Sequence, residues 1–402
     1  MKIAALLFFG CLCTTALAET TFEPWSYTEK DLFPSALVST ATVDWNGDKQ
    51  VAEDKKEKSN AKLRKDQLTL FGDENGWLAV EIQDIPKGAK IEVEISVDGF
   101  LKPAKWKGTA KKAYRDARIF PKASWDYEAL RKLRQQRPVN ATFKVTVNGV
   151  ALDDQTETCI MHSINECPFY ILWDEKGEDF DDYSFIFAAY VNENHPLVDR
   201  ILKEALQSDL VSEFSGYQSG KPEQVIEQVF AIWNVLQRRG IKYSDVSTST
   251  PSRYVVSQSV RFLDDTLEST QANCVDGSVL LASVLHKIGI NSYLVMVPGH
   301  CFLAFDDGDG RKAEVLGLET TKLGNADLKP IADLDSIPQS TMKKEFKSSF
   351  RTFSNAIEEG NAQLDQYWNK ILRGKDPDIQ LISIAESREL GIMPIASGVA
   401  SD

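Results

Sequence analysis

The sequence predicts an α+β protein whose first part is rich in strands and whose second part mixes helices with strands. Two patterns along the 402 residues support this prediction. From Gln67 to Val147, apolar and polar residues alternate with a period of two, which is typical of half-buried strands. From about residue 193, apolar residues recur at helical spacing, separated by short apolar runs. We therefore expect a small β-sandwich-like domain over residues 66–192 and an α+β domain over residues 193–402.

Turn residues divide the β-rich part into recognisable strands and one short helix. Asn148-Gly149, after the last of these strands, is a hairpin signal. The helix is expected over Trp125–Gln136. The strands are expected at Leu68–Phe71, Trp77–Ile82, Ile91–Val97 and Ala141–Val147.

Prolines mark the starts of two helices in the second part, because proline is tolerated at the first helical position. One helix is expected over Pro196–Gln207 and another over Pro222–Arg239, with Gly240 ending the second. An apolar strand is expected before them, over Phe185–Val191. A long helix is expected after them, over Met342–Leu372.

The first eighteen residues have the pattern of a cleavable export signal. Lys2 provides the positive start, Ile3–Cys13 is apolar but too short to span a bilayer, and Ala16-Leu17-Ala18 is a small-residue cleavage site. We therefore expect a signal peptide over residues 1–18 and a periplasmic or secreted mature protein. Residues 19–65 are polar and should form an irregular lead-in. No later stretch is apolar for long enough to predict a membrane span.

The charge balance and the scattered histidines limit the possible partners. A formal net charge of -13 argues against nucleic acid and against anionic membrane surfaces as partners. The four histidines show no zinc-type spacing, so we expect no metal and no cofactor. The acidic run from Asp306 to Gly310 lacks the spaced ligands of a calcium loop, which favours a hairpin turn.

Cys274 is expected to open a helix. Asn273 is a suitable N-cap and Gly289 a suitable residue after the last turn. At the first helical position, unsatisfied N–H groups and the helix dipole favour a thiolate, and the same N–H groups could help to hold an oxyanion. Asp276 could either cap this helix or orient a substrate amine. The apolar face of the helix consists of Val275, Val279, Leu280, Val284, Leu285 and Ile288.

A histidine and an acid follow on the next strands. Asn291–Val297 is an apolar strand, His300 begins the next extended run, and the chain returns past Glu314 to Glu319 after the acidic turn. In an antiparallel pair Glu319 falls within reach of His300, whereas Glu314 lies nearer the turn. Because the sequence does not fix the register, both acids remain open. Cysteine, histidine and acid in this order are typical of a thiol nucleophile, its base and the partner that orients the base.

Residues Glu223–Thr321 resemble the transglutaminase-like superfamily, a papain-related cysteine fold. Cys274 falls at the nucleophile of that family, His300 at its histidine, and Glu319-Thr320 where an Asp-Pro-Thr ending is usual. Two features depart from the family pattern. Glutamate replaces the usual aspartate, and Val275 stands where many members have an aromatic or acidic residue.

The resemblance implies an exported thiol enzyme that acts on amide bonds as a peptidase, amidase or acyltransferase. Cys274 would be acylated, His300 would act as base and acid, and Glu319 would orient His300. Substrates would be peptides or proteins in the cell envelope or outside the cell. Similar folds use a side chain upstream of the cysteine as an oxyanion donor, and Gln258 occupies such a position.

A non-catalytic member that binds a peptide or protein remains the alternative. In that case Cys274 would be a buried structural thiol, or would form a disulfide with Cys301. Cys301 neighbours His300 on a strand and should point to the opposite face. A disulfide is expected between Cys159 and Cys167, eight positions apart in a hairpin-compatible segment, because an exported protein meets an oxidising compartment. The sequence does not indicate which oligomeric state the protein adopts.

Overall fold

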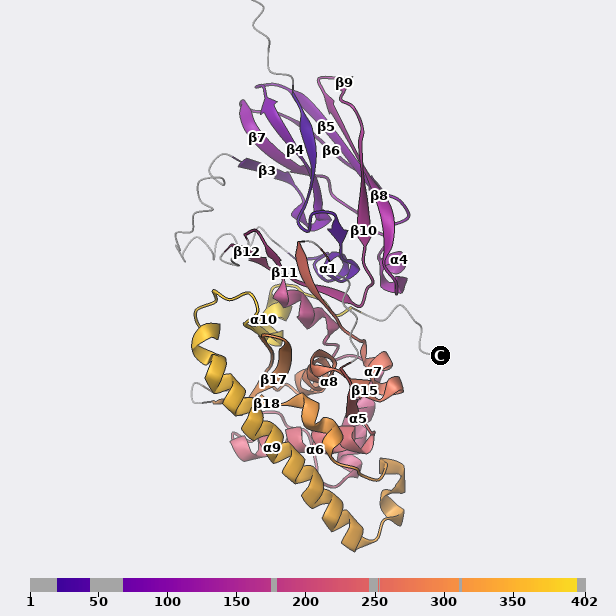
Figure 1. Ribbon diagram of the computed structural model, residues 1–402, viewed down its shortest axis with the longest axis vertical. Helices are drawn as coiled ribbons and strands as arrows, with labels where there is room; N and C mark the ends of the chain where they lie inside the picture. Colours follow the sequence, from indigo (N-terminus) through magenta and orange to yellow (C-terminus); the bar gives the residue numbers. More distant parts are fainter. Residues whose placement is uncertain are drawn as a thin grey trace, which may run out of the picture.

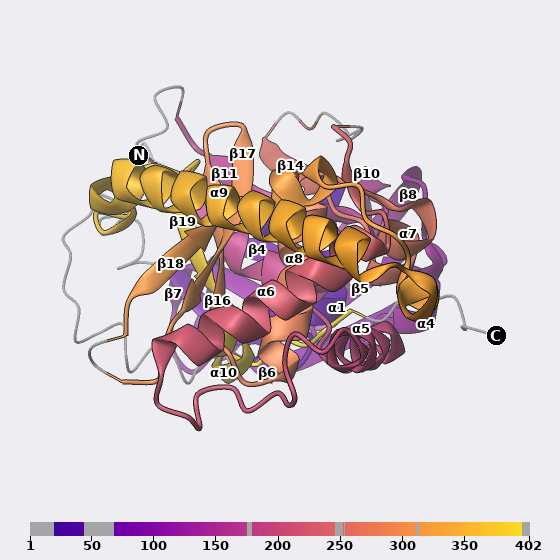
Figure 2. The same ribbon diagram turned by 90° about the horizontal axis from the view of Figure 1, so that it is seen from below.

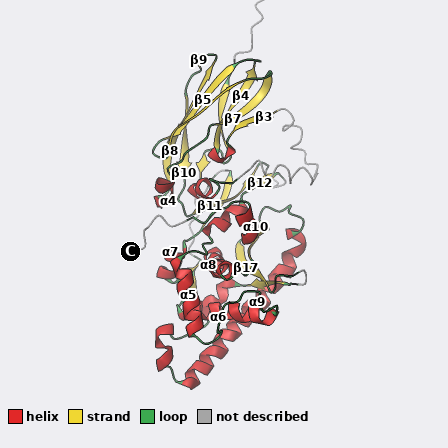
Figure 3. Ribbon diagram, turned by 180° about the vertical axis from the view of Figure 1, so that it is seen from behind, coloured by secondary structure: helices red, strands yellow, loops and turns green. Residues whose placement is uncertain are grey.

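The computed structural model describes residues 20–43, 68–174, 179–245, 252, 254–310 and 313–395. It is a mixed α+β structure in which strands gather at one end and most helices at the other (Figures 1 and 3). Within these ranges, none of the helices combines the length and the apolar character needed to cross a bilayer. The expected signal peptide, over residues 1–18, lies outside the described residues.

Two sheets form the strand-rich end of the molecule. Buried residues alternate with more exposed ones along their strands, and the buried sides join one hydrophobic cluster. The first sheet has the order β1 (Phe22–Ser26), β4 (Leu78–Ile85), β7 (Tyr114–Phe120) and β3 (Leu68–Gly72). The second has the order β2 (Asp31–Leu32), β10 (Gln155–Met161), β8 (Arg137–Val147), β5 (Lys90–Val97) and β6 (Leu101–Thr109), with β9 (Val150–Ala151) beside β8.

The lead-in expected to be irregular over residues 19–65 is folded where the structure describes it, so that prediction is wrong for residues 20–43. These residues form β1, β2 and the wholly buried helix α1 (Pro34–Ser39). These residues are folded because they are buried. Phe22, Leu32 and Leu37 belong to the core, and the Trp77 indole donates to Thr40 Oγ1 over 2.8 Å. Elements this short contain too few residues for a periodic pattern.

The β-rich part confirms one local prediction and corrects two. Asn148 and Gly149, at φ 53° and 81°, join Val147 to Val150 in the expected hairpin. The helix expected over Trp125–Gln136 is shorter, at α4 (Tyr127–Lys132), because the Asp126 carboxylate accepts from Ala129 N and caps it. The strand expected over Phe185–Val191 is instead the 3₁₀ helix η2 (Ser184–Tyr190), and a fully buried apolar run does not distinguish the two.

The disulfide expected between Cys159 and Cys167 is absent, because both thiols are free. Cys159 lies on β10, which pairs with β8 and β2. Cys167 lies on β11 (Glu166–Leu172), which pairs with β12 (Phe180–Asp182) and β14 (Val255–Ser259). The two cysteines therefore belong to different sheets rather than to one hairpin. Burial raises the pKa of the Cys159 thiol to about 11.

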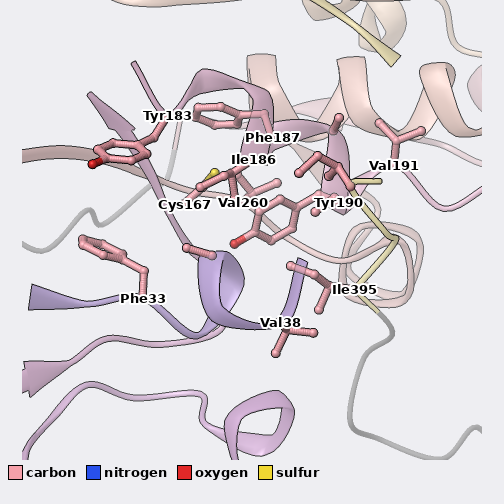
Figure 4. Packing of buried hydrophobic residues seen from close by; sticks show 14 of the residues in the cluster. Phe33, Val38, Cys167, Tyr183, Ile186, Phe187, Tyr190, Val191, Val260 and Ile395 are labelled. Atoms are coloured by element: carbon pink, nitrogen blue, oxygen red, sulfur yellow. The ribbon is translucent and has the colours of Figure 1, made fainter. Parts of the chain in front are cut away.

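One hydrophobic cluster continues from the sheets into the helical end. Figure 4 shows its junction, where Val38 of α1 lies next to Ile395, below Tyr190 of η2. The Tyr190 hydroxyl donates to Ile164 O over 2.8 Å, so the buried phenol is satisfied.

Helices enclose another sheet at the other end of the molecule. The predicted helices at Pro196–Gln207 and Pro222–Arg239 appear as α5 (Pro196–Gln207) and α6 (Pro222–Arg238). The remaining helices are α7 (Leu263–Ser269), α8 (Cys274–Lys287), α9 (Gln339–Ile371), α10 (Ile384–Glu389), η3 (Thr320–Asn325) and η4 (Ile331–Ser336), with η1 (Glu74–Gly76) in the β-rich part. The sheet is antiparallel, in the order β18 (Val315–Leu318), β17 (His300–Asp306), β16 (Ser292–Val297) and β19 (Gln380–Ser383).

Helices α8 and α9 cover opposite faces of this sheet. Along β17, Cys301 and Leu303 join the large cluster that contains the apolar residues of α8. Phe302 and Ala304 join a smaller cluster with Leu364 of α9. Figure 2 shows α9 as a long helix running past the sheet and across α6.

A glycine pair brings α9 against the backbone of β18. A Cβ on Gly360 would lie 2.4 Å from the carbonyl carbon of Gly317, and one on Gly317 would lie 2.3 Å from Gly360. Asn361 Oδ1 accepts from Gly317 N over 2.7 Å, and Ala356 O accepts from Glu319 N over 2.9 Å. The close approach therefore fixes the end of β18 on the helix.

Replacing Gly360 with alanine should destabilise the protein by about 1–3 kcal/mol, the usual cost of overpacking a tight contact. Alanine is otherwise the better helix former by about 1 kcal/mol, so propensity alone predicts the opposite sign. Urea unfolding measures the difference. The control is Gly310→Ala, where a new Cβ meets nothing within 4 Å. A Gly360→Ala variant that is at least as stable as the wild type would contradict the contact.

Candidate active site

Cys274 is the first residue of α8, as the sequence predicts, and a capping box holds it there. Asn273 Oδ1 accepts from Asp276 N over 2.8 Å, and Asp276 Oδ2 accepts from Asn273 N over 3.1 Å. Asp276 also accepts from Arg261 N over 2.8 Å and is 1% exposed. Burial raises the pKa of Asp276, and these hydrogen bonds oppose the rise. Of its two possible roles, Asp276 therefore takes the capping one.

The register of the sheet brings Glu319, rather than Glu314, to His300. Leu303 pairs with Leu318, so Glu319 lies just beyond the end of β18, near the start of β17. His300 Nε2 and Glu319 Oε2 are 2.7 Å apart. Glu314 stays at the turn, where its backbone N–H donates to Asp307 Oδ1. A two-residue turn with Gly299 at φ 71° pairs His300 with Val297.

Glu319 is a buried carboxylate with four hydrogen bonds. Besides His300, Gln363 Nε2 donates to its Oε2 over 2.7 Å, and Thr321 donates to Oε1 from N over 3.0 Å and from Oγ1 over 2.7 Å. Burial would raise the pKa of Glu319, but the hydrogen bonds from His300 and Thr321 outweigh it and lower the pKa to about 2. The side chain is therefore negative at neutral pH although only 1% is exposed.

The surroundings of His300 favour its protonated form. A hydrogen bond with the sulfur of Cys274 is the largest cause that raises the pKa of His300 to about 10, the bond with Glu319 is the next, and burial opposes both. Because Nε2 is engaged by Glu319, Nδ1 is the nitrogen left for Cys274. A cysteine, an imidazole and a carboxylate in this order are the usual arrangement of a thiol nucleophile, its base and the group that orients the base.

Side chains next to Glu319 hold the start of α8 in position. Cys274 O accepts from Ser278 Oγ over 2.8 Å and from Thr320 Oγ1 over 3.3 Å. A Cβ on Gly277 would lie 3.3 Å from the Thr320 side chain, so this turn of the helix packs closely on the residue that follows Glu319. Cys274 and Glu319 are thus tied together through Thr320.

Two further expectations concerned a disulfide between Cys274 and Cys301 and an oxyanion role for Gln258. Cys274 and Cys301 are both free thiols, and Cys301 is fully buried on the side of β17 that faces the large cluster. Gln258 lies on β14, and its amide donates to Ser259 O over 3.0 Å. Its role as an oxyanion donor stays a prediction.

Tyr243 and Gln363 are site residues that the sequence did not reveal. Tyr243 lies on the two-residue strand β13 (Lys242–Tyr243), which pairs in parallel with β15 (Gln271–Ala272), directly before Asn273. Burial raises the pKa of Tyr243, and the charges of Asp245, Cys274 and Glu319 add to the rise. Its ring is 44% exposed at the mouth of the site. Tyr243 precedes a serine-rich loop in the sequence, and nothing in that context indicates that it lies near Cys274 and Glu319.

A polar hollow of about 700 Å³ opens beside the histidine and the carboxylate. Lys322, one of its basic residues, pairs with Glu359 over 2.7 Å. The hollow is lined by Lys242, Tyr243, His300, Glu319, Thr321, Lys322, Gly324, Asn325, Glu359 and Gln363. A polar chain can therefore approach His300 from solvent.

No protein-family model, curated protein or solved structure matches this chain. The residues of the site are therefore what points to a function. These are a thiol at a helix N-terminus, an imidazole bonded to a buried carboxylate, and a polar hollow open to solvent.

The site predicts fast alkylation of Cys274 by iodoacetamide at pH 6. A free cysteine with a pKa of about 8.5 is less than ~1% ionised there, so losing the imidazolium should slow the reaction up to about 100-fold. His300→Ala should show this loss. Glu319→Gln should slow the reaction less than His300→Ala does, and Gln363→Ala should slow it least. Glu319 contacts His300 directly, whereas Gln363 acts only through its hydrogen bond to Glu319. Mass spectrometry of the Cys274 peptide gives the rates.

Glu314→Gln is the matched control and should leave the rate unchanged. Cys301 should be alkylated only after unfolding, because its side chain is buried. If Glu314→Gln slowed the reaction and Glu319→Gln did not, the assignment of the orienting carboxylate would be wrong.

Proposed function

We propose that this protein is a thiol enzyme that acts on amide bonds through Cys274, His300 and Glu319. The observation that carries the proposal is the 2.7 Å contact between His300 Nε2 and the buried Glu319 carboxylate, together with Cys274, which heads α8 and interacts with the same imidazole. Glu319 is 1% exposed and makes four hydrogen bonds. A buried carboxylate that is bonded to a histidine can orient that histidine as a base.

The first half of the reaction transfers the acyl group to sulfur. The Cys274 thiolate attacks the amide carbonyl carbon, a C–S bond forms, and the carbonyl electron pair moves to oxygen. When the tetrahedral intermediate collapses, the C–N bond breaks and the leaving amine takes the proton of the His300 imidazolium. A thioester on Cys274 and a neutral His300 remain.

The second half restores the enzyme. His300 takes a proton from water, or from an acceptor amine, as that group attacks the thioester carbon. Collapse then breaks the C–S bond and returns the thiolate and the imidazolium. Water as acceptor gives a carboxylic acid, and an amine gives a new amide.

The oxyanion that forms in each half would be stabilised by donors near the sulfur. The first backbone N–H groups of α8 point out of the helix start and lack helical partners. The Tyr243 hydroxyl is a second candidate, because its ring lines the hollow and interacts electrostatically with Cys274.

The arrangement is compatible with the transglutaminase-like domain expected over residues 193–402. A cysteine-led helix packs on an antiparallel sheet, and the histidine and acid lie at the ends of neighbouring strands. We propose that the two sheets before it are a β-sandwich-like domain. We also propose that the protein is exported and that its substrates are peptides or proteins of the envelope or the exterior. The alternative, a non-catalytic peptide-binding member, gives no role to the charged His300–Glu319 pair.

An acyl-enzyme trap tests the activity. The protein is mixed with peptides from envelope and secreted proteins, quenched in acid and digested, and an acyl adduct on Cys274 is sought by mass spectrometry. We expect an adduct in the wild type, none in Cys274→Ala, and a loss of about 10² or more in His300→Ala, as for a lost acid–base group. Adduct formation that ignores His300, or no adduct at all, would favour the peptide-binding alternative.

A further inference from the structure

An exposed apolar stripe runs along the first third of α9. Met342, Phe346 and Phe350 follow one another at intervals of four residues and so lie on one side of the helix. They are 37%, 43% and 48% exposed, which is unusual for side chains of this size.

Two of the three apolar side chains are held by ring contacts. The rings of Phe346 and Phe350 are stacked, with centroids 6.2 Å apart and planes 5° from parallel. Both rings meet the edge or face of Phe230 on α6, with centroid distances of 5.6 Å and 5.4 Å. One side of each ring is therefore anchored in the protein while the other remains in solvent.

Basic residues follow each apolar residue of the stripe. Lys343, Lys347 and Arg351 come one position after Met342, Phe346 and Phe350, so a basic row runs parallel to the apolar one. These three and the neighbouring Lys344 are exposed. The only acid between positions 342 and 351 is Glu345, which is buried and pairs with Arg238 over 2.9 Å. The stripe is thus strongly basic in a chain with a formal net charge of -13.

The stripe lies apart from the candidate active site. Gln363, which contacts Glu319, lies far along the same helix from Phe346, about 25 Å away at the usual rise per residue. Figure 1 shows the start of α9 at the end of the molecule farthest from the two sheets. The reaction proposed above therefore leaves this surface without a role.

We propose that this face of α9 docks on an anionic phospholipid bilayer. A helix with an apolar row beside a basic row lies in the interface of such a bilayer, with the apolar side chains among the acyl chains and the cations at the headgroups. A flat surface can meet the apolar row and the adjoining row of Lys343, Lys347 and Arg351 together, and the straight rows need no groove. The formal net charge of -13 argues against an anionic membrane as a partner of the chain as a whole, and this proposal departs from that expectation. Charges farther away than a Debye length of about 8–10 Å are screened, so the local cations dominate at the contact.

Flotation of the full chain with lipid vesicles tests the proposal. Vesicles of equal parts phosphatidylglycerol and phosphatidylcholine should carry the protein at low salt, and vesicles of phosphatidylcholine alone should not. The double variant Lys343→Glu/Lys347→Glu should weaken binding by about 30-fold or more, from the usual contribution of two cations near a charged surface. Phe346→Ser should weaken it by a smaller factor.

The matched control is Lys87→Glu/Lys111→Glu, which changes the net charge equally on exposed loops of the β-rich part and should bind as the wild type does. Circular dichroism checks that all variants are folded. Absence of binding to the anionic vesicles would overturn the proposal and point to an acidic protein as the partner. Equal binding by the two double variants, or equal binding to neutral vesicles, would also overturn it.

Discussion

The buried carboxylate of Glu319 is the group around which the site is organised. An isolated charge at this depth would be strongly unfavourable, so the surrounding elements must supply hydrogen bonds. β17 supplies His300, η3 supplies Thr321 and α9 supplies Gln363. The glycine contact between α9 and β18 makes this possible, because it brings the helix backbone against the strand that ends at Glu319. The orientation of His300 therefore depends on the packing of α9 against β18.

Both charged groups contribute to the stability of the folded protein, but their contributions are lost at opposite ends of the pH scale. The pKa of His300 is raised from 6.5 to about 10, so its contribution is complete below pH 6.5 and is lost as pH rises through about 10. The pKa of Glu319 is lowered from 4.5 to about 2, so its contribution is complete above pH 4.5 and is lost as pH falls towards 2. The two shifts together favour the charged forms of both groups near neutral pH, which is the state that the proposed reaction requires.

Local sequence patterns predicted the parts of the site that lie close in sequence. The cysteine-led helix, the two strands and the acid at the end of the second strand follow from capping residues, periodicity and one hairpin. Gln363 lies 44 positions after Glu319 and Tyr243 pairs across two-residue strands, so neither contact leaves a local pattern. The same reason explains the errors. The separation of Cys159 from Cys167 suggested one hairpin, but the chain changes sheets between them. Residues 20–43 are ordered by burial that no short segment reveals.

The proposed reaction depends on a His300 imidazolium held by Cys274 and Glu319, and histidine NMR measures its protonation directly. Labelled protein should show the His300 ring protonated at pH 8, with a pKa far above 6.5 and towards about 10. Cys274→Ala should lower that pKa, because the bond to sulfur is its largest cause, and Glu319→Gln should also lower it. A His300 that titrates near 6.5 in the wild type, or a pKa unaffected by Cys274→Ala, would contradict the account.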